Sequence, residues 1–106
     1  MATVANMNVW KPRSGKLQEF MAVVNKAKRI HERLGGRVRV WNAQFGGQPQ
    51  TTGYVIEHAD WKKVGEFTAK LETDDEWLRL VAEWTALREA PADLVQSGLF
   101  VEVPIG

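Results

Sequence analysis

The stretch "GYVIEHADWKKVGEF", residues 53–67, marks the change from a strand to a helix. Its first part, which ends at Glu57 and His58, is rich in β-branched and aromatic residues that favour a strand. Asp60 stands where a helix N-cap is expected, because its carboxylate can accept a hydrogen bond from the first backbone N–H groups. The stretch therefore predicts a strand ending near His58 and a short helix with the inward positions Trp61, Val64, Phe67 and Leu71.

The segments before this stretch also alternate between strand and helix patterns. Period-2 alternation predicts strands over residues 3–10, 37–45 and 51–58. Residues 17–34 carry the apolar stripe of an amphipathic helix, which Ser14 is predicted to cap and Gly35 to end in a left-handed conformation. "GGQPQ" at residues 46–50 predicts a turn, so the second and third strands are expected to form a hairpin.

The segments after it complete the pattern. "TDDE" at residues 73–76 matches a capping box with Thr73 as N-cap. It opens a helix with the apolar stripe Trp77, Leu80, Val81, Trp84 and Leu87. "SGLFVEVP", residues 97–104, predicts the last strand. The order is β-α-β-β-α-β with the second helix position split in two. This order predicts one α+β domain over residues 1–106, a ferredoxin-like four-stranded antiparallel sheet with helices on one face.

The other face of that sheet is expected to be apolar. Strand alternation suggests that Trp10, Trp41 and Phe100 share the face opposite the valine-rich positions. An exposed patch of large aromatic side chains usually marks an interface or a binding site. We therefore expect a homodimer in which two open sheet faces meet and enclose a barrel-like interior.

Composition narrows the classes of function. The chain has 14 basic and 13 acidic residues, a formal net charge of +1, and no cysteine. This balance gives no reason to expect nucleic acid or an anionic membrane as a partner. The absence of cysteine excludes disulfides and thiolate chemistry. No signal-peptide pattern and no apolar run of about 18 residues is present, so the expected location is the cytoplasm.

The whole order of elements resembles the dimeric α/β-barrel superfamily. The most specific local match is "VIEHADWKKVGEF", residues 55–67, and the Thr73-capped helix and "VEVP" at residues 101–104 also fit. Members include antibiotic-biosynthesis-monooxygenase-type (ABM-like) domains, bacterial haem-degrading oxygenases and NIPSNAP-like proteins. The superfamily hosts several chemistries, so the resemblance implies the fold and the homodimer more specifically than the function.

The resemblance also separates two chemistries. Haem-degrading members use an asparagine of the first strand, a tryptophan, and a histidine on the last helix. Asn6 or Asn8 matches the asparagine, and Trp61 matches the tryptophan. The last helix here contains no histidine, so we expect no haem and no other cofactor. Cofactorless oxygenase members act on electron-rich aromatic or polyketide substrates inside the barrel. By this resemblance the interior would be lined by Asn8, Trp10, Arg39 and Trp41.

Two neighbouring residues are candidates for moving a proton. His58 has the ordinary pKa range of a general base, or it is a partly solvated residue at the sheet rim. Glu57 points to the opposite face from His58, so the two cannot form an adjacent dyad. The sequence leaves open which of them faces the interior, and the resemblance favours Glu57.

Three further residues each have two interpretations. Arg39 shares the face of Trp41, and its charge needs a partner if the side chain is buried. Either Glu57 or Glu102 supplies a carboxylate as that partner, or Arg39 binds the acid group of a ligand. Trp61 either packs in the core or forms a wall of the cavity. His31 lies on the apolar stripe of its helix. It is either a hydrogen-bonded residue of the core or of the helix C-terminus, or a residue that binds a ligand. No metal-ligand spacing is present.

The leading hypothesis is a small-molecule-binding protein, a cofactorless oxygenase or an isomerase acting on an aromatic or enolisable substrate. Asn8 and Arg39 would stabilise an oxyanion, and Trp10 and Trp41 would stack on the substrate. His58 or Glu57 would move the proton. The remaining residues of the predicted binding set are Asn6, Trp61, Phe100 and Glu102. The alternative hypothesis is a non-catalytic, NIPSNAP-like binding or stress-associated protein.

Overall fold

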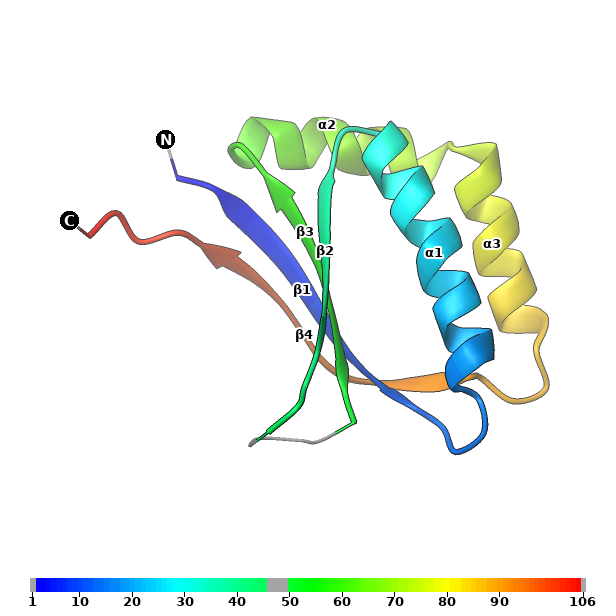
Figure 1. Ribbon diagram of the computed structural model, residues 1–106. Helices are drawn as coiled ribbons and strands as arrows, with labels where there is room; N and C mark the ends of the chain where they lie inside the picture. Colours follow the sequence, from blue (N-terminus) through cyan, green and yellow to red (C-terminus); the bar gives the residue numbers. More distant parts are fainter. Residues whose placement is uncertain (1, 46–49, 106) are drawn as a thin grey trace.

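The computed structural model describes residues 2–45 and 50–105 (Figure 1). The elements, in chain order, are β1 (Val4–Pro12), α1 (Leu17–Arg33), β2 (Arg37–Asn42), β3 (Thr52–His58), α2 (Trp61–Glu72), α3 (Asp75–Ala86) and β4 (Ala92–Val101). This confirms the predicted order, including the two consecutive helices before the last strand. Of the predicted turn "GGQPQ", residues 46–49 lie outside the described residues.

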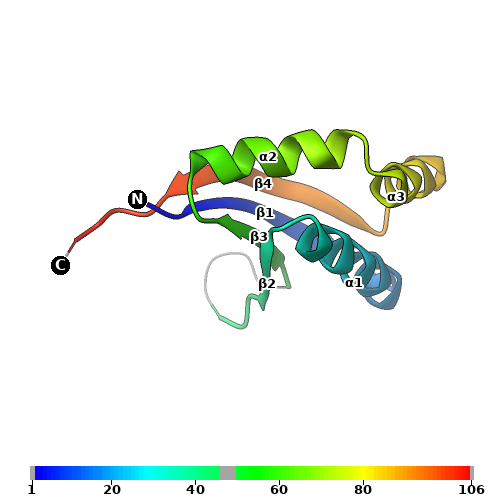
Figure 2. The ribbon, with the colours of Figure 1, turned by 90° about the horizontal axis from the view of Figure 1, so that it is seen from above.

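The four strands form one antiparallel sheet in the order β2-β3-β1-β4. β2 and β3 are neighbours, which confirms the predicted pairing of these two strands. All three helices lie on one side of the sheet, as Figures 1 and 2 show. The chain therefore has the predicted α+β, ferredoxin-like fold. β2 ends earlier than predicted, and β4 begins earlier, at Ala92, because the ladder with β1 extends to the pair Pro12–Ala92.

The core lies between the helices and the sheet. It contains Phe20, Val24, Ile30 and Leu34 from α1 and its end, Val38, Tyr54 and Ile56 from the sheet, Phe67 and Leu80 from the other helices, and Ala92. Burial of such side chains is the main favourable term in folding, about 25 cal/mol per Å² of apolar surface. Among the described residues, no helix has both the length and the apolar character needed to span a membrane.

The helix ends confirm two predicted caps and correct two. Asp60 Oδ1 accepts a hydrogen bond from the Lys63 N–H at 2.9 Å, and Gly35 has the left-handed φ of 104°. Ser14 does not cap α1, which begins after Lys16 without a side-chain cap. Thr73 ends α2, and Asp74 caps α3 by accepting from the Trp77 N–H at 2.9 Å. "TDDE" holds two possible caps in succession, Thr73 and Asp74. Asp74 also forms an ion pair with Arg33, and an uncharged threonine could not do so.

The placement of two tryptophans differs from the prediction. Trp10 lies on the helix side of the sheet and packs against Phe20 and Trp84, with ring centroids 6.0 and 5.6 Å away. Each parity of β1 carries both apolar and polar residues, so the alternation alone could not say which parity faces the helices. Trp61 was predicted to face inward from α2 but is 55% exposed. Trp41 and Phe100 are exposed and lie on the open face, as predicted.

Gly36 tests how tightly α2 and β3 pack at the start of β2. A Cβ atom there would lie 2.6 Å from Ile56 Cγ2 and 3.2 Å from Phe67 Cε2. We predict that Gly36→Ala lowers the free energy of unfolding by about 1–3 kcal/mol, because both core side chains must move. Urea unfolding followed by tryptophan fluorescence measures this change.

Gly65→Ala is the matched control, because a Cβ at this position in α2 meets no atom within 4 Å. We expect this substitution to raise the free energy of unfolding by about 0.5–1 kcal/mol, since alanine is the better helix former. Equal effects of the two substitutions would contradict the close packing at Gly36.

Candidate functional site

A cavity of about 190 Å³ lies between the helix side of the sheet and the helices α1 and α3. Its aromatic walls are Trp10, Phe20 and Trp84, and its polar members are Asn8, His31 and Tyr54. These six residues come from β1, β3, α1 and α3, so the cavity exists only in the folded chain. A mostly apolar cavity with a few convergent polar groups is the usual form of a small-molecule site.

The aromatic wall is built around Trp10. Its ring meets Trp84 edge-on, with an interplanar angle of 67°, and Phe20 at a tilt of 47°. Trp10 reaches α1 and α3 because β1 is a central strand of the sheet. Edge and tilted contacts fix the three rings without closing a face-to-face stack. The three rings therefore form one contiguous aromatic wall of the cavity.

The polar side of the cavity follows one row across the sheet, in which Asn8 pairs with Tyr54 of β3 and Ser97 of β4. Ser97 Oγ donates a hydrogen bond to Asn8 Oδ1 at 2.6 Å. This bond orients the side-chain amide, and the Asn8 Nδ2 hydrogens are then the donors that it can offer to a ligand. Asn8 is thus a positioned hydrogen-bond donor at the edge of an aromatic wall.

His31 and Tyr54 form a buried pair that joins α1 to β3. His31 Nδ1 and Tyr54 Oη are 2.7 Å apart. Burial, with a smaller contribution from the charge of His58, lowers the pKa of His31 to about 4. Burial, assisted by the charge of Glu32, raises the pKa of Tyr54. Both side chains are therefore neutral at pH 7, and the pair supplies hydrogen bonding without charge.

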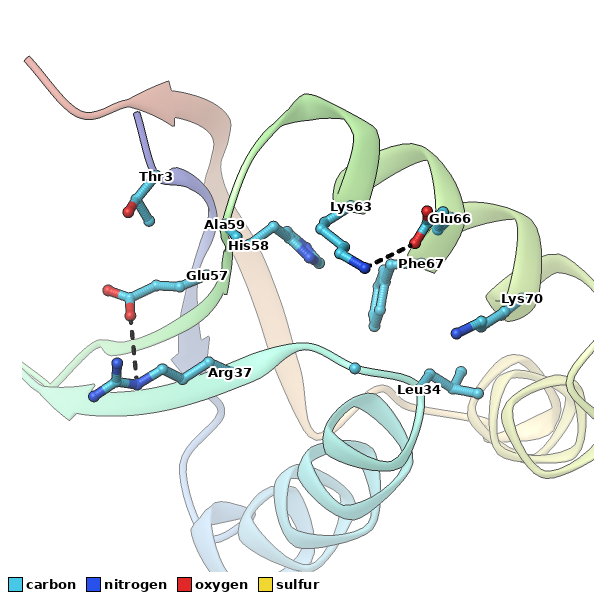
Figure 3. A pocket seen from close by; sticks show the side chains of 11 residues that line it. Thr3, Leu34, Arg37, Glu57, His58, Ala59, Lys63, Glu66, Phe67 and Lys70 are labelled. Carbon is cyan, nitrogen blue, oxygen red and sulfur yellow. Dashed lines mark hydrogen bonds and ion pairs between the residues drawn. The ribbon is translucent and has the colours of Figure 1, made fainter. Parts of the chain in front are cut away.

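A second hollow, of about 420 Å³, lies at the end of the sheet beside α2 (Figure 3). His58 lines it and is buried, with its ring centroid 4.8 Å from that of Phe67. Burial lowers the pKa of His58. The ring centroid of Phe67 also lies 5.6 Å from that of His31.

Within residues 2–45 and 50–105, no three His, Asp or Glu side chains gather as metal ligands would.

The predicted site residues divide between the two sides of the sheet. The helix side carries Asn6, Asn8, Trp10 and His58, and the open face carries Glu57, Arg39, Trp41 and Phe100. Glu102 follows β4, where its backbone N–H donates to Thr3 O at 2.9 Å. The structure brings only Asn8 and Trp10 into the cavity. The expectation that these two share one interior with Arg39 and Trp41 is wrong, because β1 presents the opposite parity to the helices.

Arg39 and Glu57 pair on the open face. Arg39 Nε is 3.3 Å from Glu57 Oε1, so Glu57 is the partner rather than Glu102. Arg37 Nε lies 3.8 Å from the same oxygen. The opposite directions of Glu57 and His58 are as predicted from strand alternation. A direct dyad between these two residues is thereby excluded.

Three of the six cavity residues were missing from the predicted site, namely Phe20, Tyr54 and Trp84, and His31 has two interpretations from the sequence. Tyr54 is the only tyrosine and shares its strand parity with His58. His31 lies on an apolar helix stripe, where an imidazole needs a polar partner. Sequence alone indicates that His31 requires a partner, but the pairing with Tyr54 depends on how α1 lies over β3.

The lowered pKa of His31 predicts a pH-dependent stability. The unfolded chain binds the proton near pH 6.5 and the folded chain near pH 4, so stability is full above pH 6.5 and falls as the pH drops towards 4. The loss is at most about 3 kcal/mol. His58 contributes in the same direction. Urea unfolding at pH 7, 6, 5 and 4.2 measures the slope.

His31→Gln removes the titrating group and keeps a hydrogen-bonding side chain. We expect this variant to be less stable at pH 7 and to lose most of the slope between pH 6.5 and 4. The Trp77 N–H and Arg33 lower the pKa of Asp74, and Arg13 lowers the pKa of Asp93, so these carboxyl groups contribute to the slope mainly at its acid end. An unchanged slope in His31→Gln would show that His31 is not the group responsible.

No protein-family model matches the sequence, and no curated protein matches it. Solved structures do match the fold. An uncharacterised NIPSNAP domain protein from Burkholderia xenovorans is 18% identical with a TM-score of 0.70, over 96% of this chain and 94% of that one. A NIPSNAP family protein from Agrobacterium tumefaciens is 17% identical with a TM-score of 0.68, over 97% and 93%.

A third match is SnoaB, a cofactor-independent oxygenase from Streptomyces nogalater. It is 16% identical with a TM-score of 0.64, over 98% of this chain and 95% of that one. At these identities the likeness concerns the fold and not the activity. The chain therefore has the fold of the dimeric α/β-barrel group, to which NIPSNAP and antibiotic-biosynthesis-monooxygenase structures belong.

Proposed function

We propose that the chain binds a small planar aromatic or enolisable molecule in the cavity between the sheet and α1 and α3. The observation that carries this proposal is the meeting of an aromatic wall with one oriented donor, Asn8, in the same cavity. The ring of the ligand would contact Trp10 and Trp84, and its oxygen would accept a hydrogen bond from the Asn8 amide. Such a donor stabilises negative charge on a phenolate or enolate oxygen.

The size of the cavity restricts the ligand. Sites for drug-sized molecules usually have about 300–1,000 Å³, and this cavity has about 190 Å³. A molecule of one or two rings is therefore the expected ligand, unless α1 and α3 move apart. His31 and Tyr54 close one side of the cavity as an uncharged pair, so the part of the ligand beside them is expected to be uncharged.

The reaction that fits such a ligand is oxygenation without a cofactor. An activated CH₂ group of the ring would become a carbonyl group; one oxygen atom of O₂ enters the product and the other leaves as water. SnoaB, which shares the fold, is a cofactor-independent oxygenase. In this reaction Asn8 would hold the enolate form of the substrate for attack by O₂.

The second candidate is binding without catalysis, and one observation favours it. Deprotonation of a phenol or an enol at neutral pH needs a base of suitable strength, near the working pH. His31, the imidazole in the cavity, has a pKa of about 4 and is a weak base. His58 lines the other hollow, and Glu57 lies on the open face. A substrate that is already partly ionised in solution would not need such a base.

We also propose that the open face of the sheet forms a homodimer. Trp41 is 62% exposed and Phe100 48% exposed on this face. Phe100 folds over Gly98, where a Cβ would lie 3.2 Å from its ring. Met7 and Val9 of β1 share this face by register and are partly exposed. Apolar surface of this extent is uncommon on a monomer and supports a second copy of the chain as the partner.

Binding in the cavity is tested with 1-naphthol and quenching of tryptophan fluorescence. We expect saturable binding, and Asn8→Ala should weaken it about fivefold because one hydrogen bond is lost. The matched control is Asn25→Ala, an exposed asparagine of α1, which should leave the affinity unchanged. Equal affinities of the two variants would exclude Asn8 as a ligand-binding residue.

Catalysis is tested by O₂ uptake with 1,5-dihydroxynaphthalene in the same variants. Uptake by the wild-type protein that Asn8→Ala reduces would support the oxygenase. Saturable binding without uptake would favour the non-catalytic candidate for this class of substrate.

The dimer is tested by light scattering. We expect a mass of about twice 12.0 kDa. Trp41→Glu should shift the mass towards the monomer, because it places a carboxylate in the interface. Trp61→Glu is the control, since Trp61 is similarly exposed but lies on α2. A wild-type monomer at micromolar concentration would contradict the dimer.

A further inference from the structure

We propose that the hollow at the end of the sheet is a second binding site, which takes a small organic monocarboxylate between α2 and the end of β3. This cleft is separate from the cavity of the proposed function and does not depend on it. Its cationic members are Arg37, Lys63 and Lys70, and its buried polar member is His58. In Figure 3 the side chains of Lys63 and Lys70 extend from α2 towards Phe67.

The cleft has the size and the floor of a ligand site. Its volume is about 420 Å³, within the range of about 300–1,000 Å³ that is usual for such sites. Phe67, Leu34 and Ala59 give it an apolar part. Phe67 is fixed by the core below it, and its ring contacts His58. The cleft can therefore hold an apolar body beside a charged group.

The charge of the lining favours an anion. Three cations, Arg37, Lys63 and Lys70, face two carboxylates, Glu57 and Glu66, which leaves a net charge of +1. Glu66 pairs with Lys63 at 3.3 Å. Glu57 lies closer to Arg39, at 3.3 Å, than to Arg37, at 3.8 Å, and Arg39 does not line the cleft.

Lys70 is the cation that these pairs leave over. No ion pair is found for it among the described residues. A single uncompensated ammonium beside an apolar floor matches one carboxylate on an apolar body better than a doubly charged phosphate. This match selects a monocarboxylate as the ligand class.

His58 supplies the second, independent feature. It is 6% exposed and lies at the end of β3. In the described part of the chain its ring makes an aromatic contact with Phe67 and no hydrogen bond. Its ring nitrogens are not among the fully buried polar atoms without a partner, which in the described residues comprise only Asn6 Oδ1. The imidazole N–H is therefore open to the cleft and can donate to a bound carboxylate.

Phe67 divides the cleft from the cavity. Its ring centroid lies 4.8 Å from His58, which lines the cleft, and 5.6 Å from His31, which lines the cavity. The cleft and the cavity have no lining residue in common. Substitutions in one can therefore be tested for effects on the other.

The test is a titration with cyclohexanecarboxylate, followed by NMR of the backbone amides and of the His58 ring. An aliphatic acid is chosen because it does not resemble the aromatic ligand of the cavity. We expect saturable shifts at His58 and along α2. Lys70→Gln should weaken binding about threefold, and Lys63→Gln with Lys70→Gln about tenfold, as surface charges are removed. Cyclohexanecarboxamide, which is uncharged, should not bind.

Two variants separate the cleft from its alternatives. Lys62→Gln removes a charge from the same helix outside the cleft and should leave the affinity unchanged. Asn8→Ala should also leave it unchanged, even if it abolishes naphthol binding. Loss of binding in Asn8→Ala but not in Lys70→Gln would place the acid in the cavity and overturn the proposal. Equal binding of acid and amide, or no saturable shift at His58, would also overturn it.

Discussion

The alternation of side chains across the sheet is the constraint on which the rest of this structure depends. Helices cover one side of the sheet, so each strand residue lies either against them or on the open face. Glu57 and His58 are neighbours in sequence but lie on opposite faces. Asn8 and Tyr54 are far apart in sequence but share one row on the helix side. The chemistry available in each hollow follows from this sorting.

Burial then determines what the sorted polar groups can do. His31 and Tyr54 meet in the core and remain neutral, because desolvation disfavours both the imidazolium and the phenolate. The pair serves as an uncharged link between α1 and β3. Arg39 and Glu57 lie on the more solvated face and pair as ions. The same sheet thus presents an apolar, neutral cavity on one side and a charged, aromatic surface on the other.

Phe67 lies between the two hollows. It belongs to the core, and its ring contacts both histidines. Phe67 lines the cleft but not the cavity, and the two hollows have no lining residue in common. The stretch at residues 53–67 therefore supplies Phe67 and one side of the larger hollow.

The sequence by itself determined the order of elements, the antiparallel pairing of β2 with β3, the Asp60 cap and the end of α1 at Gly35. These features depend on local periodicity and on single-residue conformational preferences, which a sequence displays directly. It did not determine which parity of β1 faces the helices, since Asn6, Asn8 and Trp10 share a parity with Val4 and neither parity is plainly apolar. It identified Asn8 and Trp10 as ligand-binding candidates but omitted Tyr54 and Trp84. Only the tertiary structure brought those four residues together, because the distance between side chains on different elements is set by how α1 and α3 pack on the sheet and not by spacing along the chain.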